Sequence, residues 1–266
     1  MTPDHNCTRR SVVGLLLGLG LTGCSSLRET KLSIDRSMHA TGQDSRVQFI
    51  VIHYTALPDE ASLHTLTKER VSSHYLITRK PVARILQLVD ENRRAWHAGE
   101  SMWYGRTFLN SASIGIEIVN QGPRENGDWD PYPRDQITLL AALIHDIAQR
   151  HNVKAHNIVG HSDIAPQRKQ DPGPAFPWEQ LAQQGIGRWF DPERAAVLEQ
   201  HFNETGLPET PLIQQELQRV GYTTPRSGLL DTETRNVIRA FQMHYRPQRC
   251  DGTPDAQTLA RLKALS

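Results

Sequence analysis

The stretch Val47-Gln-Phe-Ile-Val-Ile-His53 decides the fold that we expect for this chain. Its run of β-branched and aromatic residues is typical of a buried strand, and it ends on a histidine. A second strand is predicted at Ser113-Ile-Gly-Ile-Glu-Ile-Val119. Because side chains alternate along a strand, its isoleucines share one face, and Glu117 lies on the other face with the glycine and the valine. One side of each strand therefore suits a core, and Glu117 can point into a cleft.

Other segments with regular spacing surround these two strands. Helices are predicted over 59–70 and 135–150, with Asp135 in a capping position, and a closing helix over 178–189. Two strand-like runs at 74–78 and 84–89 are separated by Arg79-Lys80-Pro81 and indicate a hairpin. This mixture predicts an α/β domain over residues 46–190, with a mixed central β-sheet and covering helices.

The end of the chain has a pattern of its own. An amphipathic helix is predicted over 211–220, and a second helix follows a cap at Asp231. The segment 251–259 repeats the arrangement of Gly or Asp, then Thr, then Leu. Residues 210–266 are therefore expected to form a small all-α domain, and the charged, Pro- and Gly-containing segment 191–209 is interpreted as a linker.

The N-terminus has the features of an export signal. Arg9-Arg10 precede an apolar run of about ten residues, which at 1.5 Å per residue is too short to span a bilayer. The run ends in Leu21-Thr-Gly-Cys24, which resembles a bacterial lipobox. That resemblance implies a signal peptide over 1–23, acylation of Cys24, a tether over 24–45, and an outer membrane lipoprotein that faces the periplasm. The alternative is a plain signal peptide with a chance cysteine.

Composition narrows the possible functions. The 266 residues contain 30 Lys and Arg against 29 Asp and Glu, so a formal charge of +1 gives no electrostatic case for nucleic acid as a partner. Of the three cysteines, Cys7 would be removed and Cys24 would carry lipid, which leaves Cys250. One cysteine cannot form an internal disulfide, so the fold must be stable without one. No obligate protein partner is inferred.

A loop rich in ionisable groups occupies Gly160–Phe176. It contains His161, Lys169 and Asp171, and it is interrupted by Pro166, Pro172, Gly173 and Pro174, which exclude a long helix or a central strand. Such a loop is either a solvated segment with an ion pair or part of a functional site.

Catalytic zinc sites need three protein ligands and one open position. His53 ends a buried strand, where its imidazole could face a cleft, and the loop could add His161 and Asp171. The competing interpretation is that these histidines are ordinary surface or core residues. Asp163, two residues after His161, is interpreted as a turn or cap residue.

Five motifs together resemble a known family. They are Val51-Ile-His-Tyr-Thr55, Ser73-His-Tyr-Leu-Ile77, Ala95-Trp-His-Ala-Gly99, Asn110 with Ser113-Ile-Gly-Ile-Glu117, and Gly160–Phe176. Their order and content resemble the zinc-dependent N-acetylmuramoyl-L-alanine amidases of the Amidase_2 type, which are related to phage T7 lysozyme and to peptidoglycan recognition proteins. The tail resembles a peptidoglycan-binding module through Asp231, Thr234, Phe241 and Gln242.

The resemblance implies specific roles for the site residues. It makes His53, His161 and Asp171 the ligands of Zn²⁺, Glu117 the general base, and Lys169 the group that stabilises the oxyanion. Trp96, His97 and Asn110 are expected to contact substrate, although core packing is an equal alternative for Trp96 and His97.

The expected function is hydrolysis of the amide between N-acetylmuramic acid and L-alanine in peptidoglycan or its muropeptides. A non-catalytic peptidoglycan-recognition protein is the main alternative, and a zinc peptidase that acts within the stem peptide is a third. We further expect that deleting residues 210–266 weakens binding to sacculi but leaves cleavage of small muropeptides intact.

Overall fold

A computed structural model describes residues 32–265 of the chain, which divides into two compact units between Gln43 and Asp44. Residues 32–43 of the first unit contain no helix or strand. The predicted signal segment 1–23 and Cys24 lie outside the described residues. Within the described part, none of the helices has the length and apolar character needed to cross a membrane.

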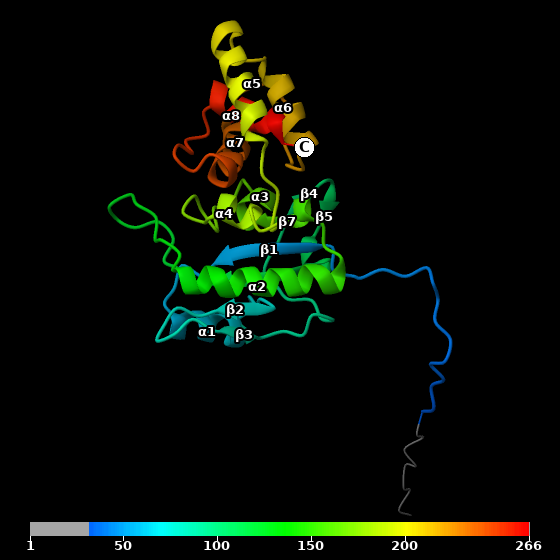
Figure 1. Cartoon of the computed structure of the whole chain (residues 1–266). Coiled ribbons are helices and arrows are strands. Elements are labelled where there is room, and N and C mark those ends of the chain that lie inside the picture. The colour runs from blue at the N-terminus through cyan, green and yellow to red at the C-terminus, as the bar shows by residue number, and fades with distance from the viewer. Residues whose placement is uncertain (1–31, 266) are drawn as a thin grey trace, which may run out of the picture. The chain divides into compact units, whose positions relative to one another are not determined.

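The second unit is built on a five-stranded sheet (Figure 1). Its strands are β1 (Phe49–Tyr54), β2 (Tyr75–Ile77), β3 (Ile85–Gln87), β6 (Ser113–Ile118) and β7 (Ile158–Gly160), in the order β3-β2-β6-β1-β7. Strands β2, β6, β1 and β7 run parallel, whereas β3 pairs with β2 as an antiparallel hairpin. The predicted mixed sheet and the predicted hairpin are both confirmed.

Helix α2 (Arg134–His151) covers one face of this sheet (Figure 1). The apolar side of α2 packs on the isoleucines of β1 and β6 in one buried cluster, which includes Ile137, Leu140, Ile144 and Ile147 of the helix. The helix begins after Pro133 without a side-chain cap, so Asp135 lies in the first turn and is not the predicted cap. The helix is stabilised by the apolar face that it buries.

The opposite face of the sheet carries shorter elements. They are α1 (Asp59–Lys68), the small hairpin of β4 (Met102–Trp103) and β5 (Arg106–Thr107), the 3-10 turn η1 (Leu109–Ser111) and α3 (His161–Ile164). The 3-10 turn η2 (Ala155–Asn157) leads into β7, and α4 (Trp178–Ala182) contributes Trp178 and Leu181 to the buried cluster of α2. Helix α4 ends seven residues before the predicted limit, because Gly185 and Gly187 adopt positive φ angles of 77° and 75° and break the helix.

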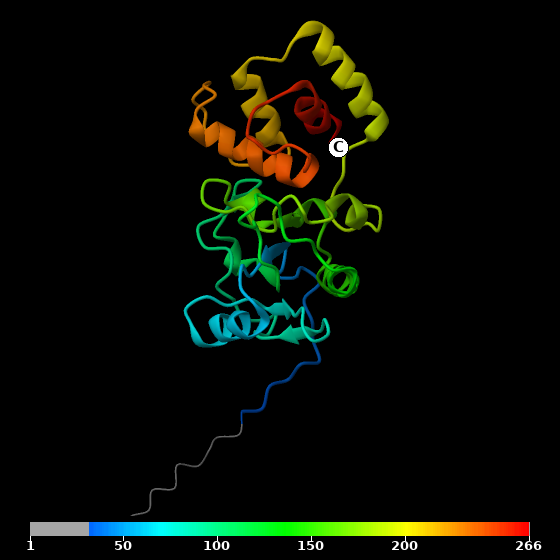
Figure 2. The same ribbon diagram turned by 90° about the vertical axis from the view of Figure 1, so that its left-hand side faces the viewer.

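The C-terminal region contains four helices that gather in one bundle (Figure 2). They are α5 (Pro192–Thr205), α6 (Thr210–Arg219), α7 (Thr232–Tyr245) and α8 (Ala256–Ala264). Asp231 caps α7 by accepting a hydrogen bond of 2.8 Å from Thr234 N, as the sequence predicts. An all-α C-terminal region is therefore confirmed.

Helix α5 occupies the segment that we interpreted as a linker. Asp191 caps it by accepting hydrogen bonds from the backbone nitrogens of Glu193 and Arg194. Pro192 takes the first helical position and Gly206 follows the last turn, so a proline and a glycine of this segment mark the ends of a helix. The helix packs on α8 and buries Ala195 and Phe202.

The bundle and the sheet share a hydrophobic core. One cluster joins Phe49 and Val51 of β1 and Trp103 of β4 to Tyr222 and Phe241 of the bundle. Residues from Asp44 onward accordingly form a single compact unit. The bundle is packed directly on the side of the sheet that carries the ionisable residues.

Candidate metal centre

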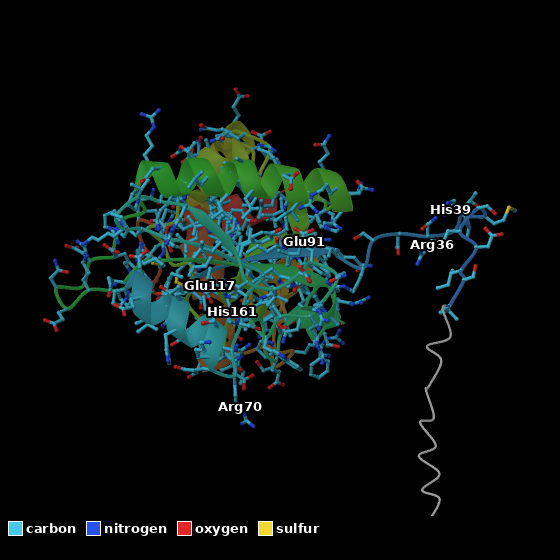
Figure 3. All side chains as sticks on the ribbon, turned by 90° about the horizontal axis from the view of Figure 1, so that it is seen from below. Arg36, His39, Arg70, Glu91, Glu117 and His161 are labelled. Atoms are coloured by element: carbon cyan, nitrogen blue, oxygen red, sulfur yellow. The ribbon has the colours of Figure 1, made fainter. Side chains whose placement is uncertain are left out.

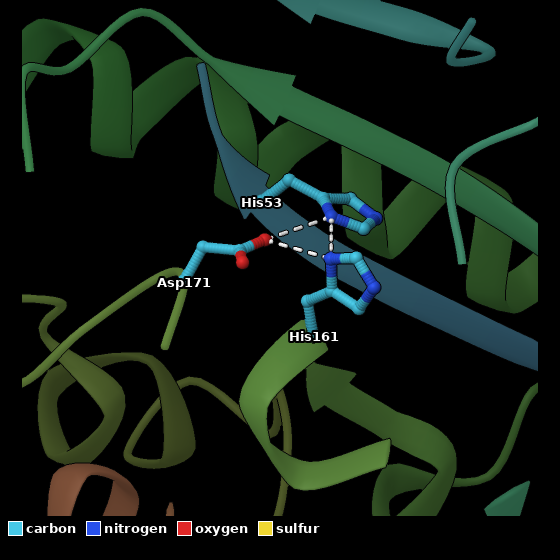
Figure 4. A group of neighbouring side chains, drawn as sticks. All are labelled: His53, His161 and Asp171. Carbon is cyan, nitrogen blue, oxygen red and sulfur yellow. Dashed lines mark hydrogen bonds and ion pairs between the residues drawn. The ribbon is translucent and has the colours of Figure 1, made fainter. Parts of the chain in front are cut away.

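Three predicted ligands converge where β1 ends and α3 begins (Figure 4). The Nδ1 atoms of His53 and His161 lie 3.0 Å apart, and Asp171 Oδ2 lies 2.9 Å from the first and 3.0 Å from the second. All three residues are buried, with exposed fractions of 7% or less. The structure therefore brings together residues that are 108 and 118 positions apart in the chain.

The remaining nitrogen of His161 fixes the proton on its ring. His161 Nε2 lies 3.1 Å from the carbonyl oxygen of Ala98, which can only accept a hydrogen bond. We assign the imidazole proton to Nε2 because this carbonyl is nearer than the other neighbour of Nε2, Arg168 Nη2 at 3.4 Å, and Nδ1 then presents a lone pair to His53 and Asp171. Metal-bound histidines are commonly oriented by a backbone carbonyl in this way.

A chain of hydrogen bonds fixes the proton of His53 by the same logic. Ser113 Oγ donates to the carbonyl of Leu109 at 2.7 Å, so it must accept from His97 Nε2 at 3.1 Å. With its proton on Nε2, His97 accepts at Nδ1 from His53 Nε2, which is 3.1 Å away. His53 Nδ1 is left without a proton.

This arrangement fits a cation. Two nitrogen lone pairs and a carboxylate oxygen face one another at about 3 Å with no proton between them, which is repulsive unless a positive charge lies among them. A tetrahedral zinc ion with ligand bonds of about 2.0–2.1 Å separates neighbouring ligand atoms by about 3.3 Å. The donor set of two imidazoles and one carboxylate is a usual one for catalytic zinc. The residues present therefore suit zinc.

Electrostatics at the cluster agree with the protonation states. Burial and the neighbouring His161 lower the pKa of His53 to about 4, so the ring is neutral at pH 7. Burial raises the pKa of the Asp171 carboxyl, but the two imidazoles beside it, His161 first and then His53, outweigh that effect and hold the pKa below its usual value. Both states are those that bind a metal.

Glu117 lies beside the cluster because of strand register. In the parallel pair of β1 and β6, Glu117 is directly opposite His53, at the carboxyl ends of both strands. Burial, and then the negative charge of Asp171, raise the pKa of Glu117 to about 8, while Lys169 opposes the rise. Its Oε2 atom is buried and has no hydrogen-bond partner among residues 32–265. A carboxyl group whose pKa lies this close to neutral pH can exchange a proton with a reacting group.

Gly115 makes room for His97. A Cβ atom at Gly115 would lie 2.4 Å from Cγ of the His97 ring, well inside van der Waals contact. The ring of His97 thus rests directly on the backbone of β6, between His53 and Ser113. Only glycine at this position allows the hydrogen-bond chain to reach His53.

The cluster opens into a cleft of about 590 Å³. Lys169 and Trp96 line it together with Glu117, and side chains of α1 and α7 form other parts of its wall. Trp96 is 53% exposed and stacks under the guanidinium of Arg94 at 4.3 Å. Figure 3 shows Glu117 and His161 close together beside α1, whereas Glu91 lies apart from them. The cleft therefore presents a carboxyl group, a lysine and an exposed aromatic ring next to the ligand cluster.

The residues expected to contact substrate lie in different surroundings. Trp96 lines the cleft and is free to contact a ligand. Both ring nitrogens of His97 are taken by His53 and Ser113, although the ring borders the cleft. Asn110 Oδ1 accepts from the backbone nitrogens of His97 and Ala98, at 3.1 and 2.7 Å, and holds that turn in place. The sequence gives no signal for the positioning roles of His97 and Asn110, because these roles depend on how the His97 ring lies over Gly115 and on the turn η1.

Arg168 is a further residue that sequence reasoning missed. Its guanidinium donates to the carbonyls of Ala98 and Glu100, and thus ties the loop after α3 to the turn that His161 contacts. The sequence shows only a basic residue next to Lys169. The pairing of the two loops becomes visible only in the fold.

Comparison with known proteins gives the family. Residues 43–174 match the profile of the Amidase_2 family, described as N-acetylmuramoyl-L-alanine amidase, and residues 207–262 match a putative peptidoglycan binding domain. The chain is 43% identical over 268 residues to N-acetylmuramoyl-L-alanine amidase AmiD of Escherichia coli (strain K12). The match covers 96% of this chain and 95% of that protein.

Two solved structures are similar over most of the chain. The structure of AmpDH3 from Pseudomonas aeruginosa in complex with anhydromuramic pentapeptide has a TM-score of 0.83 and 41% identity, and it covers 88% of this chain and 97% of that one. The complex of Escherichia coli AmiD with the substrate anhydro-N-acetylmuramic acid-L-Ala-D-γ-Glu-L-Lys has a TM-score of 0.78 and 44% identity, over 87% of this chain and 93% of that one. This chain belongs to the N-acetylmuramoyl-L-alanine amidase family.

Proposed function

We propose that this protein is a zinc hydrolase that cleaves the amide between N-acetylmuramic acid and L-alanine in peptidoglycan and muropeptides. The observation that carries the proposal is the set of three unprotonated ligand atoms, from His53, His161 and Asp171, beside the unpaired carboxylate of Glu117. Family membership and the muropeptides bound by similar proteins indicate the substrate class.

The metal ligands, Glu117 and Lys169 would have separate roles in hydrolysis. Zinc, when bound by His53, His161 and Asp171, supplies Lewis-acid activation of water and of the scissile carbonyl. Glu117 Oε2 takes the proton of the attacking water and can return it to the leaving nitrogen of L-alanine. The ammonium of Lys169 lies on the same cleft and stabilises the negative charge that develops on the carbonyl oxygen. This favours the transition state over the bound substrate.

This proposal is tested by incubating the protein with a small soluble muropeptide and identifying the products by mass. The zinc-loaded protein is expected to release an intact stem peptide that starts at L-alanine. Cleavage between two residues of the peptide would indicate a peptidase, and binding without any product would indicate a recognition protein.

We also propose a place for the protein in the cell. Leu21-Thr-Gly-Cys24 with Ser25 supports cleavage before Cys24, acylation of that cysteine, and anchoring in the outer membrane. Residues 32–43, which have no helix or strand, then serve as part of a tether. Labelling cells with an alkyne fatty acid should tag the wild type and not Cys24→Ala. Equal labelling of both proteins would refute the anchor.

A further inference from the structure

Helix α7 of the C-terminal bundle lies against the segment that carries two predicted ligands. Gln167 Nε2 donates to the carbonyl of Glu233 at 3.0 Å, and Asn236 Nδ2 donates to Gln167 Oε1 at 3.0 Å. Near the other end of α7, His244 reaches Asp163, which belongs to the short helix α3 that starts at His161. The bundle therefore contacts the metal loop, residues 160–171, at two places.

The deeper of these contacts is a buried carboxylate. Asp163 is 1% exposed. Its Oδ1 accepts from the hydroxyl of Tyr222 at 2.6 Å, and its Oδ2 accepts from Gly160 N and from His244 Nδ1, each at 2.8 Å. A carboxylate at this depth needs such donors to offset the loss of water. Two of the three come from the C-terminal bundle.

His244 is held rigidly in this position. Its ring is stacked between Trp178, with centroids 3.9 Å apart and an interplanar angle of 13°, and Tyr245, at 4.0 Å and 10°. The ring is 3% exposed, so packing fixes its plane and directs Nδ1 at Asp163. The position of the Asp163 carboxylate is accordingly set by side chains outside the metal loop.

The carboxylate in turn sets the backbone of both loop ligands. Its bond to Gly160 N fixes the residue that precedes His161. The next residue, Ser162, donates its backbone N–H to the carbonyl of Asp171 at 2.8 Å, which ties the two ligands together. A shift of Asp163 would therefore move His161 and Asp171 relative to His53 on the sheet.

We propose that the C-terminal bundle is a structural part of the metal centre, in which Tyr222 and His244 act through Asp163 as positioning residues for the ligands. This role differs from attachment to peptidoglycan, and it extends to small soluble substrates. It replaces our sequence-based expectation that the tail is dispensable for their cleavage. The activity part of the proposal rests on the proposed function, whereas the metal-binding part does not.

The first test compares two tyrosine hydroxyls in the full-length protein. Tyr222→Phe removes the bond to Asp163, and Tyr75→Phe is a matched control, because Tyr75 is also buried and its hydroxyl donates to the carboxylate of Glu91 at 2.7 Å, away from the metal loop. Zinc affinity is measured by competition with a chelator. Loss of a direct partner of a metal ligand commonly weakens metal binding by about 10–100-fold. Because Tyr222 acts one step further out, through Asp163, we expect Tyr222→Phe to weaken zinc binding several-fold. Tyr75→Phe should bind zinc as the wild type does.

The second test measures the effect of removing the hydrogen bond that His244 Nδ1 donates to Asp163. His244→Leu removes it, whereas His244→Asn places an amide N–H near the position of Nδ1. His244→Leu should weaken zinc binding and lower kcat on a small muropeptide with little change in KM, and His244→Asn should recover part of both. Circular dichroism checks that each variant is folded.

Two results would overturn the proposal. One is a folded Tyr222→Phe or His244→Leu protein with the zinc affinity of the wild type. The other is equal loss in Tyr222→Phe and Tyr75→Phe, which would mean general destabilisation. If the wild type cleaves no muropeptide, the proposed function fails, but the ratio of zinc affinities still decides the role of the bundle.

Discussion

The two faces of the central sheet differ in character although the same strands, β1 and β6, build both. On one face Ile50, Ile52, Ile114, Ile116 and Ile118 are buried against α2. On the other, His53 and Glu117 line the cleft, and Ser113 and Gly115 lie against the ring of His97. Because side chains alternate, neighbouring residues serve stability and chemistry in turn. Substitutions one position apart should therefore have separable effects.

Glu117→Ala should have the largest effect on activity. Loss of the general base is expected to lower kcat by about 10²–10⁴-fold, while zinc content and unfolding stability stay near those of the wild type. Zinc analysis of the purified variant and steady-state kinetics check this. Loss of zinc from the variant would mean that Glu117 is a ligand and that its assigned role is wrong.

Ile116→Ala, at the preceding position, should give the reverse result. Ile116 is 0% exposed, and truncating it leaves a cavity against α2 that costs about 2–5 kcal/mol of unfolding free energy. Denaturant unfolding measures that cost. The kcat of the folded fraction should stay near the wild-type value. A large fall in kcat would contradict the assignment of stability to one face and chemistry to the other.

Gly115→Ala tests the polar face without removing a functional group. The added methyl group would overlap the His97 ring, which must move and release His53 from its hydrogen bond. We expect zinc affinity to fall about tenfold or more, by analogy with other losses of a partner to a metal ligand. Chelator competition at fixed pH measures it, and unchanged affinity would mean that His97 does not orient His53.

The sequence was sufficient to predict the three metal ligands. His53 ends an apolar strand, and His161 and Asp171 lie in a loop bounded by Pro and Gly, so their positions could be predicted from pattern together with the family motifs. The role of His97 could not, because it depends on which way one ring turns above Gly115. Helix α5 was missed because Pro192 and Gly206 suit helix ends as well as linkers. The contacts of Tyr222 and His244 with Asp163 span 59 and 81 residues, beyond any local pattern.

A smaller effect, on unfolding stability, is expected from substitution of Glu91, which lies away from the cleft. Glu91 accepts hydrogen bonds from Arg150, His151 and Tyr75, and these partners, Arg150 foremost, lower its pKa to about 2 from an ordinary 4.5. A lowered pKa in the folded state adds stability that is complete above pH 4.5 and is lost as pH falls towards 2.

Glu91→Gln should therefore cost on the order of 1–2 kcal/mol at pH 7 and nothing near pH 2, after allowance for solvent screening. Urea unfolding at several pH values measures the difference. Zinc affinity should be unaltered, since no residue of the cleft contacts this group in the described part of the chain. A cost that does not change with pH would contradict the assigned pKa.

The most direct test of the zinc amidase centre is hydrolysis of anhydro-N-acetylmuramic acid-L-Ala-D-γ-Glu-L-Lys in H₂¹⁸O by the zinc-loaded protein, with products identified by mass. We expect one ¹⁸O atom in the carboxylate released on the muramic acid side, and an unlabelled tripeptide with a free L-alanine amino group. Chelation of the metal should abolish both products. Label within the peptide, or turnover that survives complete removal of metal, would contradict this expectation.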